Sequence, residues 1–158
     1  MRRTFVVFAS VLAGVLLAGL TTAIAAADLA QEETIVLGER TVRGKVLDLA
    51  GKPDDFKPGD RYVFRSRLTD EVGVAGHLYV DCSVHFAGRD TCAQVYDLGV
   101  RGMVTAHGIV PASELEVGGT WTLAVTGGTG EFENVRGSIA VEILNDAGDS
   151  EHALHLLP

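Results

Sequence analysis

Apolar and polar residues alternate along most of the chain after its first thirty residues. The clearest case is the segment from Leu78 to Phe86, LYVDCSVHF, in which every second residue is apolar. Successive side chains of a β-strand point to opposite faces, so this segment predicts a half-buried strand with one apolar and one polar face. Helical periodicity is almost absent from the rest of the chain.

Similar patterns predict strands at Thr34–Leu37, Thr41–Leu49, Arg61–Thr69, Thr91–Leu98, Val100–Val110, Thr120–Thr126, Ser138–Leu144 and His152–Leu157. Segments rich in glycine, proline, aspartate and asparagine separate them, and the longest is the predicted loop Ala50–Asp60. About eight short strands at regular spacing predict an all-β domain, either an eight-stranded antiparallel barrel or a sandwich.

The first 27 residues are predicted to be a secretory signal peptide. Arg2 and Arg3 precede an apolar run from Phe5 to Leu20, and small residues follow up to Ala27. This order of basic, apolar and small-residue regions is typical of exported proteins. The alternative is a retained anchor helix, because the apolar run is long for a signal peptide. The sequence therefore predicts a single barrel domain at 28–158 that is secreted or retained at the cell envelope.

The charge of the chain disfavours several classes of partner. Without residues 1–27, 11 basic residues remain against 21 acidic ones, a formal charge of about −10. Nucleic acids and anionic membranes are bound by clustered positive charge. We therefore expect no nucleic-acid partner, and a ligand that is neutral, apolar or cationic.

Cys82 and Cys92 are predicted to form a disulfide. Turn-forming residues lie between them, and a hairpin centred near Ala87 places the two cysteines opposite one another. Export exposes the pair to an oxidising environment. The alternative is two buried free thiols.

The glycine-rich stretch from Leu123 to Ile139, LAVTGGTGEFENVRGSI, looks at first like a phosphate-binding loop. It lacks the lysine of such loops, and Glu131 and Glu133 would face any bound phosphate. The glycines are therefore predicted to shape a turn between two strands. These structural glycines are Gly127, Gly128, Gly130 and Gly137.

Histidines and serines do not form a recognisable catalytic or metal-binding pattern. The five histidines, at 77, 85, 107, 152 and 155, lack the paired strand spacing of metal ligands, and His152 and His155 are expected on opposite faces of one strand. The G-x-S-x-G motif of α/β-hydrolases is absent. We therefore expect no metal site and no hydrolase chemistry.

The stretch from Leu123 to Gly137 closely resembles the signature of the plant dirigent proteins and allene oxide cyclases, and of bacterial proteins with the same barrel. Weaker matches lie upstream in the same order, at Gly59–Phe64, Val72–Tyr79 and Gly102–Ile109. Together the matches extend over roughly residues 33 to 145. The chain thus resembles a bacterial secreted member of this family over nearly all of its predicted domain.

The resemblance implies an eight-stranded antiparallel barrel with a largely apolar cavity, often trimeric in the plant members. Plant allene oxide cyclases hold an unstable fatty-acid epoxide in the cavity while it cyclises. Dirigent proteins hold phenoxy-radical products while these couple with one handedness. Neither activity uses a metal or an organic cofactor, so the resemblance implies a small hydrophobic ligand, no cofactor and a homo-oligomer.

The functional residues of the plant cyclases do not carry over to this chain. Where those enzymes have a cavity cysteine, this chain has Leu78 and Tyr79, and its only asparagines, Asn134 and Asn145, fall in predicted turns. The jasmonate-type reaction is therefore not expected, and no catalytic residue is assigned.

Dirigent proteins use aspartate and arginine side chains in the cavity, which makes several polar strand residues candidates for ligand binding. The candidates are Tyr62, Arg65, Arg67, Tyr79 and Asp81, together with His107 and with Trp121 as part of a cavity wall. The alternative is that Asp81 and the arginines form a solvated outer face or an interface between protomers, and that His107 is an ordinary strand histidine.

Three functions follow in order of expectation. The first is a barrel that binds a small hydrophobic molecule and steers its cyclisation or coupling without a cofactor. The second is a true cyclase or isomerase that works by shape and a few polar groups. The third is a structural or interaction barrel with a filled core, from which a ligand-sized cavity would distinguish the first two.

Overall fold

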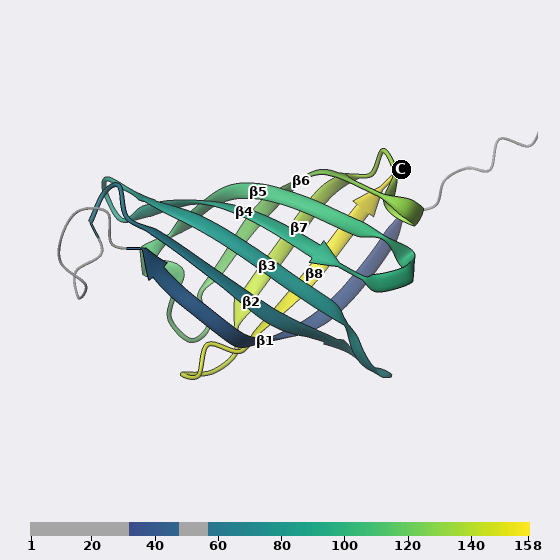
Figure 1. Ribbon diagram of the computed structural model, residues 1–158, viewed down its shortest axis with the longest axis horizontal. Coiled ribbons are helices and arrows are strands. Elements are labelled where there is room, and N and C mark those ends of the chain that lie inside the picture. The colour runs from purple at the N-terminus through teal and green to yellow at the C-terminus, as the bar shows by residue number, and fades with distance from the viewer. Residues whose placement is uncertain (1–31, 48–56) are drawn as a thin grey trace, which may run out of the picture.

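Eight antiparallel strands form one closed barrel, in which sequence neighbours pair and β8 pairs with β1 (Figure 1). The computed structural model describes residues 32–47 and 57–158. The strands are β1 (Glu33–Leu47), β2 (Arg61–Asp70), β3 (Gly73–His85), β4 (Arg89–Asp97), β5 (Met103–Pro111), β6 (Thr120–Gly128), β7 (Arg136–Ile143) and β8 (Ser150–Leu157). Single 3-10 turns are η1 (Gly99–Arg101), η2 (Ala112–Glu114) and η3 (Gly130–Phe132). The predicted eight-stranded antiparallel barrel is confirmed.

Two predictions fall wholly or mostly on residues outside the described ranges. These are the signal peptide at 1–27 and most of the loop Ala50–Asp60. Within the described ranges, no helix has both the length and the apolar character that a membrane-spanning helix needs.

Two segments predicted as separate strands, Thr34–Leu37 and Thr41–Leu49, join into one continuous strand, β1, as far as Leu47, where this described range ends. The intervening Gly38-Glu39-Arg40 has the composition of a turn, yet it keeps its ladder partners on both β2 and β8. A β-bulge between Thr41 and Arg43 then shifts the register. The shift keeps Thr41 before the bulge and Gly44 after it on the interior side, and such bulges often re-aim side chains next to functional sites.

The strand predicted at Val100–Val110 begins later than expected, at Met103. Gly99, the first residue of η1, and Gly102, which directly follows η1, have positive φ angles of 64° and 113°. Residues in this conformation interrupt an extended strand, so the chain makes a turn before β5 begins.

Apolar faces of the strands point into the barrel. On β3 the inward residues are Leu78, Val80, Cys82 and Val84, whereas the alternating polar residues point outward. The C-terminus lies at one end of the barrel (Figure 1). Large buried side chains fill this end. They include Leu37, Leu68, Val104, Phe132, Leu154 and Leu156.

The glycine-rich stretch forms the connection from β6 through η3 to β7. Gly130 has a φ of 66°, and a Cβ atom there would lie 2.6 Å from the carbonyl oxygen of Arg101. At Gly137 a Cβ atom would lie 1.9 Å from the carbonyl oxygen of His155, on the neighbouring strand β8. These glycines therefore allow a tight turn and a close approach of two strands, while the Glu131 carboxylate pairs with Arg101.

A disulfide joins Cys82 on β3 to Cys92 on β4. The two residues are direct partners in the antiparallel ladder, and the hairpin loop between the strands includes Ala87 and Gly88, both with positive φ. Both cysteine side chains are buried inside the barrel. A disulfide is compatible with an extracellular protein.

Candidate functional site

The barrel is hollow at the end opposite the C-terminus. The cavity has a volume of about 680 Å³, which is in the range of small-molecule sites. Its rim includes Lys45, His85, Phe86 and Leu115. Its walls are mostly apolar and include Val46, Phe64, Leu78, Val80, Val84, Val110, Trp121 and Ile143. The filled half of the barrel closes the cavity at depth.

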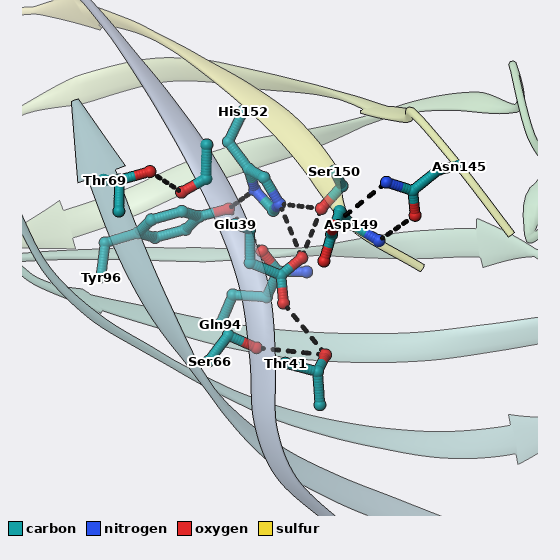
Figure 2. Close-up of polar contacts among 11 residues, drawn as sticks. Glu39, Thr41, Ser66, Thr69, Gln94, Tyr96, Asn145, Asp149, Ser150 and His152 are labelled. Carbon is teal, nitrogen blue, oxygen red and sulfur yellow. Dashed lines mark hydrogen bonds and ion pairs between the residues drawn. The ribbon is translucent and has the colours of Figure 1, made fainter. Parts of the chain in front are cut away.

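We call this closed end the cavity floor. Several side chains form a hydrogen-bonded floor network there, namely Glu39, Thr41, Ser66, Gln94, Tyr96, Ser150 and His152 (Figure 2). The Ser150 hydroxyl donates a hydrogen bond to Oε2 of Glu39. The Nε2 atom of His152 lies 2.9 Å from the Ser150 hydroxyl and 3.3 Å from the same Glu39 oxygen. Strand pairing brings the three together, because Glu39 on β1 faces Ser150 on β8 in the ladder.

The floor network extends to β4. The Tyr96 hydroxyl donates to Oε1 of Gln94 at 2.5 Å and lies 2.7 Å from Nδ1 of His152. Through these contacts His152 has a polar partner at each ring nitrogen. Within the ranges described, no group of three or more histidine, cysteine, aspartate or glutamate side chains is placed to hold a metal ion.

On the other side of Glu39, two hydroxyl groups complete the network. Thr41 donates to Oε1 of Glu39 at 3.5 Å, and Ser66 on β2 donates to the Thr41 hydroxyl at 3.4 Å. Both distances are at the long limit of hydrogen bonding. Oε1 is therefore held more loosely than Oε2.

The floor network sets the charge of its members. Burial alone raises the pKa of Glu39, but hydrogen bonds and the charge of His152, with help from Ser150 and Ser66, outweigh burial and lower that pKa. Burial raises the pKa of Tyr96 well above its usual value, and the nearby Glu39 charge adds to the rise. The floor thus holds a buried carboxylate beside a neutral phenol.

Two of the seven predicted ligand-binding residues, Tyr62 and Trp121, line the cavity. The Tyr62 hydroxyl donates to Oδ2 of Asp90 at 2.9 Å, and burial, with the Asp90 charge, raises the pKa of Tyr62. The indole Nε1 of Trp121 is buried and has no hydrogen-bond partner among the described residues. An acceptor that reached this nitrogen would remove an unmet hydrogen bond worth about 1 to 3 kcal/mol.

The other five predicted residues lie on the outer face of the barrel. Arg65, Tyr79 and Asp81 line a shallower hollow there, over β1 to β4. Asp81 forms an ion pair with Arg61, whose hydrogen bond lowers the Asp81 pKa. Arg67 and His107 are exposed on β2 and β5. Their positions follow from the strand alternation, which turns the apolar face of each strand inward.

The floor residues Glu39, Gln94, Ser150 and His152 were not among the predicted ligand-binding residues. His152 did carry a signal, because its predicted strand places it opposite His155, and His152 is 1% exposed whereas His155 is exposed. Glu39 carried none, because a glutamate between glycine and arginine is typical of a solvated turn. Its burial depends on partners from β8, more than a hundred residues away in the sequence.

Neither a protein-family model nor a curated protein sequence matches the chain. Among solved structures, a pyocyanin demethylase matches with a TM-score of 0.66 at 25% identity, covering 79% of this chain and all of that chain. AbnU, an exo-specific intermolecular Diels-Alderase, matches with a TM-score of 0.65 at 14% identity, over 80% of this chain and 98% of its own.

A heme-binding cyclase that catalyses a cycloaddition during neoabyssomicin biosynthesis matches with a TM-score of 0.64 at 18% identity. That match covers 80% of this chain and 66% of the cyclase. The chain therefore has an eight-stranded barrel fold similar to that of the demethylase and these cyclases.

Proposed function

We propose that the barrel binds a small, largely hydrophobic molecule in its cavity and steers the cyclisation of that molecule. The observation that supports this most strongly is the cavity itself, about 680 Å³ of mostly apolar space closed at depth by a hydrogen-bonded polar floor. Apolar walls fix the shape of a bound molecule, and a few polar groups fix its orientation. A folded-back conformation held in this way reacts faster because its reacting atoms are already close together.

Similar barrels support this choice of reaction. AbnU is a Diels-Alderase, and the heme-binding cyclase catalyses a cycloaddition. Both reactions are cycloadditions between unsaturated groups, which a shaped apolar cavity can hold close together, although the AbnU reaction is intermolecular. We also propose that the chain is related to the allene oxide cyclase and dirigent proteins, is secreted, and assembles as a homo-oligomer, on the basis of its sequence motifs and N-terminal segment.

A filled core, as in a purely structural barrel, does not fit the interior. The filled half accounts for the stability of the fold, but the other half leaves space of ligand size. A second function, acid-base isomerisation, is favoured by one specific observation, the buried Glu39 carboxylate at the floor.

Equilibrium dialysis against neutral phenols, quinones, polyenes and fatty acids tests the binding function. We expect saturable binding of one molecule per chain by members of the neutral classes. Substitution Val84→Phe adds an aromatic ring to a cavity wall and should weaken this binding at least tenfold.

The matched control is Val74→Phe on the same strand. Val74 is 66% exposed and does not line the cavity, so this substitution should leave binding unchanged. If no compound bound saturably, or if both variants bound as well as the natural chain, the cavity would not be a binding site.

A further inference from the structure

The floor carboxylate of Glu39 has an uneven set of partners. Oε2 accepts the hydrogen bond from Ser150 and lies 3.3 Å from Nε2 of His152 (Figure 2). Oε1 has the long contact of 3.5 Å with the Thr41 hydroxyl, and the Ser66 hydroxyl behind Thr41 also favours the charged form of Glu39. Glu39 and Thr41 both line the cavity, so Oε1 is the carboxylate oxygen that a bound molecule can engage by displacing one weak hydrogen bond.

The hydrogen bonds around His152 account for the charge of Glu39. Tyr96 has one hydroxyl proton and donates it to Gln94, so the Tyr96 oxygen accepts a hydrogen bond from Nδ1 of His152. Ser150 likewise donates its one proton to Glu39 and therefore accepts from Nε2 of His152. Both ring nitrogens of His152 thus lie beside hydroxyl oxygens that can accept from them, and the charge of His152 favours the carboxylate form of Glu39.

This arrangement holds a buried base at the floor of a mostly apolar cavity. Away from water, a carboxylate that faces a bound molecule loses little free energy to desolvation when it reacts, because that cost is met when the protein folds. The His152 charge also stabilises negative charge that develops in the bound molecule. The same charge weakens Glu39 as a base, so only acidic protons are within its reach.

We propose that Glu39 is a general base that moves a proton within the bound molecule, which makes the barrel a proton-transfer isomerase for neutral carbon acids. Oε1 takes a proton from a carbon next to a carbonyl or a conjugated system, and the electron pair of that C–H bond moves into the conjugated system. Glu39 then returns the same proton to another atom of that system. The product is an isomer, and the carboxylate is regenerated.

This inference rests on the proposed binding function and narrows the ligand class. The cavity lining contains two buried carboxylates, Glu39 at the floor and Asp90 above it, against one buried histidine, His152, while the Lys45 ammonium lies at the rim. A carboxylate ligand would be repelled by both, and its burial without a partner would be costly. Neutral molecules are therefore expected, whereas fatty acids and other organic anions are disfavoured.

A nitrobenzisoxazole is a suitable probe, because it is neutral and planar and reports removal of one carbon-bound proton. When a base takes that proton, the ring N–O bond breaks, and a coloured cyanophenolate forms while the base keeps the proton. We expect saturable turnover by the natural chain. Substitution Glu39→Gln should reduce kcat about 100-fold or more, in line with the loss of a general base.

Control variants separate chemistry from folding. Glu142→Gln neutralises an exposed carboxylate on β7 and should turn over the probe like the natural chain. Glu39→Asp keeps the carboxylate but shortens the side chain by one methylene, which draws the carboxylate back from the bound molecule. This variant should fold and retain part of the activity. Circular dichroism of all the variants confirms that they fold.

His152 acts on the reaction through Glu39 and is a positioning residue. The titratable groups that face Glu39 are His152 from β8 and Tyr96 from β4. Substitution His152→Gln removes the cation, so burial then raises the Glu39 pKa. The pH at which turnover is half-maximal should rise, a shift that a merely structural role for His152 would not produce.

The outcomes distinguish the two proposals. Dialysis of the probe with the natural chain and with Glu39→Gln gives binding independently of turnover. Binding without turnover, or equal turnover in Glu39→Gln, would overturn the assignment of Glu39 and leave the binding function intact. If neither this probe nor any compound of the dialysis panel bound the natural chain, the binding function would fail, and the isomerase with it. Binding of panel compounds but of no neutral carbon acid would overturn the isomerase alone.

Discussion

Glu39 is a carboxylate that is 7% exposed, in the interior of a barrel whose walls are mostly apolar. A buried charge is tolerated only where partners offset the loss of water. Here His152 and the hydroxyl groups of Ser150 and Ser66 do so, and together they lower the Glu39 pKa despite its burial. Removal of any one partner should therefore change the pKa of Glu39 more than it changes the fold around Glu39.

The pH dependence of stability tests the charge of Glu39. A group whose pKa is lower in the folded chain than its unfolded value of about 4.5 stabilises the fold above that value, and this contribution is lost as the pH falls through the folded pKa. Near neutrality, Glu39→Gln should lower the free energy of unfolding by about 1.5 to 3 kcal/mol.

Urea unfolding of both chains from neutral to acidic pH measures this contribution. The gap between the natural chain and Glu39→Gln should shrink as the pH falls below about 4.5. A gap that stayed constant or grew in acid would show that Glu39 is not charged in the folded chain.

At the residue scale, the sequence predicted two of the aromatic cavity residues, Tyr62 and Trp121, and missed the charged residues of the floor. Tyr62 and Trp121 are large and partly apolar, and such residues usually face the interior whatever their partners. The position of a buried glutamate depends on a specific set of hydrogen bonds from other strands. Local composition does not contain that information.

At the scale of elements, the disulfide ties together the hairpin formed by β3 and β4. It closes a loop of 10 residues, for which the chain-entropy estimate is roughly 2 to 3 kcal/mol. Replacement of both Cys82 and Cys92 by alanine should lower the free energy of unfolding by about this amount, measured by denaturant titration. Intact mass after alkylation without reductant provides the check, because two alkylated thiols would contradict the bridge.

The outer ladder between β1 and β2 carries like charges in register. Arg40 faces Arg67, and Arg43 faces Arg65, and none of the four forms an ion pair with another described residue. Like charges directly opposite each other destabilise a sheet. The strand pairing is therefore held by backbone hydrogen bonds and inward packing rather than by these side chains.

Substitution Arg67→Glu should replace one repulsive pair with an attractive one and raise the free energy of unfolding by about 0.5 to 1 kcal/mol. Arg67→Gln removes only the repulsion and should give a smaller gain. Thermal unfolding at low and high salt is the measurement, and the gain of Arg67→Glu should shrink at high salt. Equal stability of the three chains at low salt would contradict the cross-strand account.

Most strands were predicted from alternation alone, because a half-buried strand shows its two faces directly in the sequence. The errors arose where glycine and charge look like a turn. Gly38-Glu39-Arg40 continues β1 because both neighbouring strands pair with it, whereas Gly99 and Gly102 do form the turn around η1. Whether each segment continues a strand or forms a turn depends on its pairing with neighbouring strands. A short stretch of sequence does not show that pairing.

At the scale of the whole molecule, the barrel divides into a filled half and a hollow half. Leucine and phenylalanine side chains fill the half near the C-terminus, whereas smaller valines and a disulfide line much of the other half. The filled half provides a rigid base on which the floor network is held. The sequence indicated a barrel and, through its resemblance, a cavity, but the cavity volume depends on how all eight strands pack together.

Trp121 provides the most direct test of the central claim that a small molecule binds inside the barrel. It is the only tryptophan of the chain, and it lines the cavity. Titration with a neutral ligand should change its fluorescence saturably in the natural chain and in Val74→Phe, and the change should be lost in Val84→Phe. A fluorescence change of equal size and affinity in all three chains, or none at all with a ligand that dialysis shows to bind, would place the ligand outside the cavity and contradict the account.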